Sequence, residues 1–160
     1  MKTKHGGWRE EYRQERIHDA YKSEKKLPEP TRCQACGAVF KDGRWQWLAA
    51  PEGAHETLCP ACRRIRDRFP GGYVTLLGDF FAAHRDDILH LVRNREAREK
   101  AEHPLERVMA VEDIEGGVQM TTTDGHLARA IGDAVFDAYK GELSVRYAPE
   151  DNLVRVRWMR

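Results

Sequence analysis

The sequence has no long apolar run. Its 160 residues are 41% hydrophobic and 33% charged, and no segment approaches the roughly 20 apolar residues that a membrane-spanning helix needs. The N-terminal residues Met1-Lys2-Thr3-Lys4-His5 lead into charged sequence and lack the apolar stretch of a secretory signal. We therefore expect a soluble protein that stays in the reducing cytoplasm and has no membrane partner. In that compartment, paired cysteines indicate metal ligands or redox groups in preference to structural disulfides.

Catalytic motifs are also missing. The chain has no phosphate-binding loop, nucleophile elbow or metalloprotease motif. Its histidines are scattered, and none forms an evident dyad with a cysteine or a serine. His84 and His90 are six residues apart on a predicted helix, so they do not share a face. The sequence therefore predicts a protein that is not an enzyme.

A strong net charge is absent too, although the formal value of +1 conceals an asymmetry. Residues 1–68 contain 15 Lys+Arg against 10 Asp+Glu, a balance of +5, whereas residues 69–160 contain 12 against 16, a balance of −4. A basic half favours a polyanionic partner such as RNA. Alternatively, its basic residues neutralise a nearby cluster of thiolates.

The four cysteines form two Cys-x2-Cys pairs, separated by the 22 residues from 37 to 58. Two residues between cysteines let both thiolates of a tight turn face one ion, and two such knuckles supply a tetrahedral site. Gly37, directly after the first pair, permits a backbone conformation that a side chain would obstruct. The spacing therefore predicts one structural Zn²⁺ ion bound by Cys33, Cys36, Cys59 and Cys62.

Three alternatives remain open for the cysteines. Cys59 and Cys62 alone would suit a redox pair at a helix N-terminus, but the βαβ context is absent and the first cysteine pair is left unexplained. Iron suits the same four thiolates, because tetrahedral sulfur accepts both metals. His55, four residues before Cys59, could replace one thiolate.

The periodicity of apolar residues predicts an α+β fold in four parts. Residues 1–30 have few apolar side chains and many charges, so we expect a flexible basic arm that either orders on RNA or remains a solvated tail. Residues 31–78 are assigned to the zinc ribbon. Apolar side chains spaced by three and four predict a long connecting helix over residues 79–102. Residues 103–160 are predicted to fold separately as a ββαββ domain.

Within the predicted ββαββ domain, one helix separates two pairs of strands. Asp124 suits the N-cap of this helix and Gly141 its C′ position. Alternating apolar residues predict strands at Val108–Val111, Val118–Thr123, Leu143–Tyr147 and Val154–Trp158.

Two groups of arginines are candidate nucleic-acid contacts. The first follows the second cysteine pair, where guanidinium groups could bind phosphates: Arg63, Arg64, Arg66 and Arg68. The second alternates with valines on the last two strands and is expected on the open face of the sheet: Arg146, Arg155 and Arg157. A solvated polar face explains the second pattern equally well. Trp45 and Trp47 share one strand face, and for them we favour burial of at least one over stacking on bases.

A family resemblance rests on several of these segments. The chain resembles an uncharacterised bacterial family of zinc-ribbon proteins at Cys33–Gly37, Gly43-Arg44-Trp45, Cys59–Cys62, His103–Arg107, Thr122–Arg129 and Val154–Trp158. This resemblance covers nearly all of residues 30–160. More remotely, the paired knuckles and the following helix resemble the N-terminal part of the large-subunit export adaptor of archaea and eukaryotes, a ribosome-binding protein. The resemblance implies zinc ligation by the four cysteines and a ribosomal partner.

These observations predict a zinc-binding, non-catalytic protein that binds structured RNA or a ribosomal particle. The alternative is a protein-interaction adaptor with a structural zinc ribbon, in which the projecting helix and the open sheet receive another protein.

Overall fold

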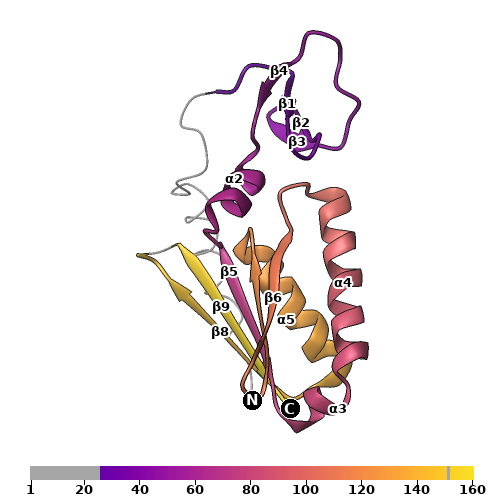
Figure 1. Cartoon of the computed structure of the whole chain (residues 1–160), viewed down its shortest axis with the longest axis vertical. Coiled ribbons are helices and arrows are strands. Elements are labelled where there is room, and N and C mark those ends of the chain that lie inside the picture. The colour runs from indigo at the N-terminus through magenta and orange to yellow at the C-terminus, as the bar shows by residue number, and fades with distance from the viewer. Residues whose placement is uncertain (1–25, 151) are drawn as a thin grey trace, which may run out of the picture.

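The chain folds around two separate sheets in a computed structural model that describes residues 26–150 and 152–160. A small four-stranded sheet lies at one end of an elongated molecule, and a five-stranded sheet forms the other (Figure 1). The short helix α2 (Pro60–Asp67) lies between them. Most of the predicted basic arm, residues 1–30, lies outside the described residues.

The small sheet is the predicted ribbon. Its strands are β1 (Thr31–Cys33), β2 (Val39–Lys41), β3 (Arg44–Gln46) and β4 (His55–Thr57), in the order β3-β2-β1-β4. Strand β1 runs antiparallel to β2 and parallel to β4. Asp42 and Gly43 form the predicted tight turn between β2 and β3, with φ of 54° and 77°. Such left-handed conformations are most accessible to Asp, Asn and Gly, which explains the Asp-Gly pair.

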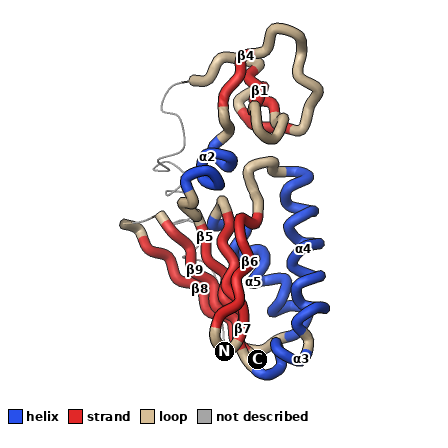
Figure 2. Tube along the Cα trace, viewed as in Figure 1, coloured by secondary structure: helices blue, strands red, loops and turns tan. Residues whose placement is uncertain are grey.

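The larger sheet has the order β6-β7-β5-β9-β8. Helices α3 and α4 connect β5 to the β6–β7 hairpin, and α5 connects that hairpin to the β8–β9 hairpin (Figure 2). The strands are β5 (Gly72–Leu77), β6 (Val108–Ile114), β7 (Gly117–Thr122), β8 (Glu142–Ala148) and β9 (Leu153–Met159). The helices are α3 (Asp79–Ala83), α4 (Arg85–Glu102) and α5 (Gly125–Tyr139).

The α+β class is confirmed, but β5 corrects the predicted domain boundary. The sequence assigns Tyr73–Leu77 to the ribbon, whereas β5 lies at the centre of the larger sheet, antiparallel to β7 and parallel to β9. Its inward side chains, Val74 and Leu76, are fully buried in the main core. The alternation of residues identifies a strand but not the sheet that it joins, so the ββαββ unit gains a fifth, central strand.

Helix α5 has the predicted caps. Asp124 Oδ1 accepts hydrogen bonds from the backbone N–H groups of His126 and Leu127, at 2.6 and 3.3 Å, and α5 ends two residues before Gly141, whose φ is 89°. The long helix predicted over residues 79–102 is instead divided at His84 into α3 and α4. Helix α5 packs on the sheet and α4 packs on α5, so both cover the same face (Figure 1).

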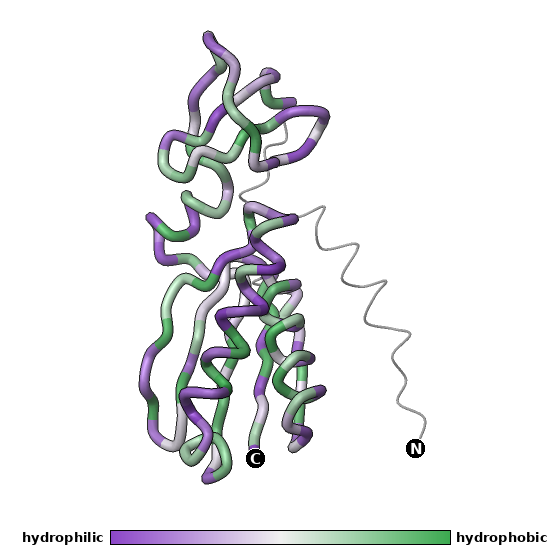
Figure 3. Tube along the Cα trace, turned by 90° about the vertical axis from the view of Figure 1, so that its right-hand side faces the viewer, coloured by the Kyte–Doolittle hydropathy of each residue, from purple (hydrophilic) through white to green (hydrophobic). Residues whose placement is uncertain are grey.

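The main core lies between this sheet and its two helices. It is built from Val74, Leu76, Phe81, Ile88, Val118, Met120, Leu127, Ile131, Val135, Val156 and Trp158, among others. In contrast, the last turns of α4 are predominantly hydrophilic (Figure 3). No helix in the described part of the chain combines the length and the apolar character needed to cross a bilayer.

Candidate metal centre

The four cysteines converge at the junction of the ribbon with α2. Cys33 ends β1 and Cys36 lies in the turn that follows, while Cys59 caps α2 and Cys62 lies in its first turn. All four Sγ atoms lie within 4.8 Å of one another, and those of Cys36 and Cys59 are 3.9 Å apart. A tetrahedron with Zn–S bonds of about 2.3 Å has S···S edges of about 3.8 Å. The cluster therefore has the dimensions of a metal site with four thiolate ligands.

Backbone N–H groups point at the sulfurs from both knuckles. The N–H of Ala38 lies 3.5 Å from Cys36 Sγ, and Gly37 before it has a φ of 82°, as the sequence predicts for this position. The N–H of Cys59 donates to Cys33 Sγ at 3.3 Å, and the N–H of Cys62 donates to Cys59 Sγ at 3.4 Å. The N–H of Cys62 belongs to the N-terminus of α2, whose partial positive charge favours thiolates.

Burial, backbone hydrogen bonds and mutual repulsion shift the pKa values of Cys33, Cys59 and Cys62 in different directions. Burial raises the pKa of Cys59, and the charges of the other three cysteines raise it further. Burial likewise raises the pKa of Cys62. Burial also opposes ionisation of Cys33, but backbone hydrogen bonds, that of Cys59 first, outweigh it and lower the pKa of Cys33 to about 6. A divalent ion would relieve this repulsion, because ligating thiols give up their protons to the metal.

One residue of this centre was missed by sequence reasoning. Arg107, in the segment between α4 and β6, extends its guanidinium onto the cluster and donates to Cys62 Sγ at 3.1 Å and to Cys36 Sγ at 3.0 Å. A third contact reaches Cys59 Sγ at 3.6 Å. The guanidinium is buried, and burial alone would lower its pKa, but the hydrogen bond to Cys62 and the charge of Cys36 raise the pKa above its usual value.

Arg107 fixes the position of the ribbon relative to the five-stranded sheet. Its Nε donates to Pro104 O at 2.9 Å, and its backbone N–H donates to Thr123 Oγ1 at 2.9 Å. Leu105, two residues earlier, packs against the cysteine cluster. A Zn²⁺ ion with four thiolates would carry a net charge of −2, and a buried guanidinium beside it would supply part of the compensating charge. The only sequence signal for this role was the His103–Arg107 segment, which carried the family resemblance without indicating contact with the cysteines.

We expect Arg107→Ala to lower the free energy of unfolding by about 3–5 kcal/mol, because it leaves buried thiolates without their cation. Zinc affinity should fall about 10- to 100-fold, the range typical for loss of a residue that supports metal ligands. Arg107→Lys should lie between wild type and Arg107→Ala, since it keeps the charge but loses the planar fork. Denaturant titration and competition with a chromophoric zinc chelator measure the two quantities.

Arg85→Ala provides the matched control for this prediction. Arg85 forms an exposed ion pair with Asp113 at 2.8 Å, and such surface pairs contribute about 0–1 kcal/mol. Equal losses of stability in the Arg85 and Arg107 variants, with zinc affinity unchanged in both, would show that Arg107 is an ordinary peripheral contact.

The arginine run after Cys62 is only partly available to a polyanion. Arg64, predicted as a phosphate contact, is instead buried: its Nη1 donates to Phe69 O at 3.1 Å, and its guanidinium lies over the Phe69 ring. Arg63 donates to Thr57 Oγ1 at 3.2 Å, and Arg66 forms an ion pair with the adjacent Asp67. Arg63 and Arg64 thus hold α2 to its neighbours, whereas Arg66 and Arg68 are exposed. The spacing could not show this, because the four positions point in different directions around the helix.

The second arginine group lies together on the open face of the larger sheet. Arg146 of β8 is directly opposite Arg155 of β9, and Arg157 is opposite Ser144. All three arginines are exposed, while the valines that alternate with them face the helices. The guanidinium of Arg155 also lies 4.7 Å from the centre of the Tyr73 ring on β5. This placement is the one that the alternation of the two strands predicts.

The two ribbon tryptophans have structural contacts. Trp45 is half-buried against the cysteine cluster and packs on Phe40, with ring centroids 5.5 Å apart. Trp47 is more exposed, but its Nε1–H donates to Lys100 O at 2.7 Å, at the C-terminal end of α4. This bond satisfies one of the carbonyl groups that a helix end leaves unpaired. His55 is exposed in β4, outside the group of four cysteines.

No protein-family model, curated protein or solved structure gives a significant match. The resemblance to the bacterial zinc-ribbon family and to the export adaptor therefore remains an expectation from sequence.

Proposed function

We propose that this chain is a non-catalytic cytoplasmic protein that uses a structural zinc ion to hold its ribbon in place and binds structured RNA, free or in a ribosomal particle, through its open sheet face. The zinc part of the proposal rests on the four converging cysteines and on the distances between their Sγ atoms. A site in which all four ligands are cysteines has no open position for substrate, so the ion would be structural. Zinc suits the site better than the harder divalent cations, which prefer oxygen ligands.

The pairing of Arg146 with Arg155 carries the RNA part of the proposal. Directly opposed residues of an antiparallel pair have Cβ atoms about 4.5–5.5 Å apart, and like charges at that distance destabilise the sheet. Arg157 lies on the same face, so three guanidinium groups share one side of two strands. A polyanion would relieve this repulsion, and fork-shaped guanidinium groups match phosphate oxygens.

The neighbouring strand adds an aromatic side chain to the same face. Tyr73 is half-buried beside Arg155 and is flanked on its other side by Thr121 of β7. Phosphate contacts position an RNA, while an aromatic ring can stack on an unpaired base at a loop or bulge. The combination fits a structured RNA with a splayed base better than a uniform duplex.

Salt-dependent RNA binding tests this function. The logarithm of the affinity of the zinc-loaded protein for a hairpin RNA should fall linearly with the logarithm of salt concentration. Changing Arg146, Arg155 and Arg157 together to Gln should reduce the magnitude of that slope by about two to three, because each phosphate contact contributes about 0.7–0.9. Stability should be unchanged or slightly higher, since the opposed charges are gone.

A matched variant separates site-specific binding from loss of charge. Arg93, Arg98 and Lys100 are exposed on α4, and changing all three to Gln removes the same formal charge far from the sheet face. We expect this control to bind RNA with a nearly unchanged slope. Equal slopes in both variants, or no RNA binding by the parent at physiological salt, would contradict the proposal. The second outcome would favour the protein-interaction adaptor, whose candidate surface includes the exposed Val111 and Ile114 on edge strand β6.

A further inference from the structure

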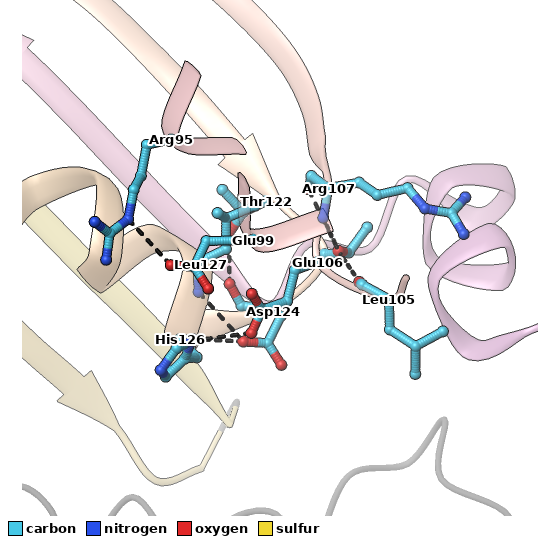
Figure 4. A network of polar contacts seen from close by, with 10 residues as sticks. Arg95, Glu99, Leu105, Glu106, Arg107, Thr122, Asp124, His126 and Leu127 are labelled. Atoms are coloured by element: carbon cyan, nitrogen blue, oxygen red, sulfur yellow. Dashed lines mark hydrogen bonds and ion pairs between the residues drawn. The ribbon is translucent and has the colours of Figure 1, made fainter. Parts of the chain in front are cut away.

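The segment that delivers Arg107 to the cysteines presents its neighbour, Glu106, to a different group of side chains. Glu106 Oε1 lies 2.9 Å from His126 Nδ1 in the first turn of α5 (Figure 4). Glu99, on the last turns of α4, completes a group whose ligand atoms all lie within 4.8 Å of one another. Three separate elements thus bring two carboxylates and one imidazole together.

We propose that Glu99, Glu106 and His126 form a second metal site, which takes a divalent first-row transition-metal ion such as Mn²⁺ on oxygen and nitrogen ligands. Cis ligands of an ion with bonds of about 2.1 Å lie about 3.0 Å apart. The 2.9 Å between Glu106 Oε1 and His126 Nδ1 already matches that edge. Glu99 is the ligand that must adjust, and its position near the end of α4 allows a change of side-chain rotamer.

The carboxylate of Glu106 is buried and only partly hydrogen-bonded, which points to a cation independently of the distances between the ligand atoms. Its side chain is 6% exposed, and among the described residues its Oε2 atom has no hydrogen-bond partner. A buried polar atom without a partner costs free energy, and a carboxylate costs more than a neutral group. His126 satisfies only Oε1, so half of the carboxylate is left without compensation. A metal ion would satisfy the carboxylate as a whole.

The surrounding charges favour a cation on balance. Asp124 lies beside the group and adds a third carboxylate, although its Oδ1 already caps α5 (Figure 4). Three features oppose a cation: the N-terminus of α5, the charge of protonated His103 near Glu106, and Arg95, whose Nε lies 3.0 Å from Glu99 Oε1. That ion pair lacks hydrogen-bond geometry, because the buried Arg95 Nε has no hydrogen-bond partner among the described residues. An ion at this site would have to compete with the charge of Arg95 for Glu99.

The second site would differ from the cysteine site in ligand chemistry and in access. Carboxylate and imidazole ligands accept Mn²⁺, whereas four thiolates select softer ions such as Zn²⁺. The His126 side chain is 43% exposed, so solvent reaches one side of the group and water could fill the remaining coordination positions. An ion there would join α4, the 103–107 segment and α5, beside the residue that supports the cysteines.

Manganese titration of the full chain, loaded with one equivalent of zinc, tests the second site. Calorimetry and electron paramagnetic resonance should detect one Mn²⁺ per chain, with the zinc retained in elemental analysis. Glu99→Gln, Glu106→Gln and His126→Ala should each weaken Mn²⁺ binding about tenfold or more, since even residues that only support metal ligands contribute that much. Glu102→Gln, an exposed position on the same helix as Glu99, should leave the affinity within about twofold of wild type.

The second metal site can be refuted by the same titration. Absence of Mn²⁺ binding, or binding that the three ligand variants leave unchanged, would overturn it and reduce the group to a structural ion pair. Glu106→Gln is the variant most exposed to folding effects, because Glu106 is buried, so circular dichroism and zinc content must match wild type before its affinity is compared. Should it fail to fold, the half-exposed His126 and the less deeply buried Glu99, whose side chain is 16% exposed, supply the same test independently. RNA takes no part in this experiment, so its result is separate from the RNA-binding proposal.

Discussion

Removal of zinc should unfold the ribbon and leave the five-stranded sheet intact. The ribbon has little core of its own: its buried cluster consists of three cysteines, Ala38 and Ala61, with a few half-buried neighbours. So small a core cannot offset the conformational entropy of ordering some 30 residues. Structural zinc contributes about 10–16 kcal/mol in small zinc-binding peptides at neutral pH, so its loss should exceed any stability that the ribbon retains.

Elemental analysis and amide spectra of two preparations check this expectation. Protein made without added metal should contain close to one zinc per chain. Cys36→Ser and chelator-treated wild type should both lose the dispersed amide signals of β1 to β4, while those of β5 to β9 persist. A metal-free chain whose ribbon signals remain dispersed would show that the four cysteines are not a structural metal site.

A fragment of residues 103–160 should fail to fold, whereas one of residues 70–160 should fold without the ribbon. The shorter fragment lacks β5, which pairs with β7 on one side and β9 on the other. Without it the sheet divides into two hairpins, β6–β7 and β8–β9, and isolated hairpins are at best marginally stable in water. The fragment also lacks α4, which supplies Ile88, Leu89 and Val92 to the core.

The longer fragment is the control, because it restores β5, α3 and α4 but contains no cysteine. Dispersed amide spectra and a cooperative thermal transition should appear in the 70–160 fragment alone. Folding of both fragments would mean that residues 103–160 form an independent domain, as the sequence predicts, and that β5 is not needed for it to fold. Failure of both would mean that the ribbon, through Arg107 and Trp47, is needed for the sheet to fold.

The candidate sites differ in how far the sequence could predict them. The four cysteines were predictable because each knuckle is a local turn, and its spacing alone directs both sulfurs to one point. The sheet arginines were predictable because a strand alternates its side chains with period two. Arg64 was assigned to the wrong environment, and Arg107 was missed. Neither residue belongs to a periodic pattern that indicates where its side chain goes.

The sequence by itself determined the elements and their local chemistry: the two knuckles, the Asp42-Gly43 turn, the Asp124 cap of α5 and most of the strands. These features depend on residues within a few positions of one another, so the local sequence is enough to predict them. Only the tertiary structure decided that β5 is the central strand, that Arg107 reaches the cysteines, and that Glu106 meets His126. Each of these joins segments far apart in the chain, where the partner is chosen by packing of the whole core and not by any local preference.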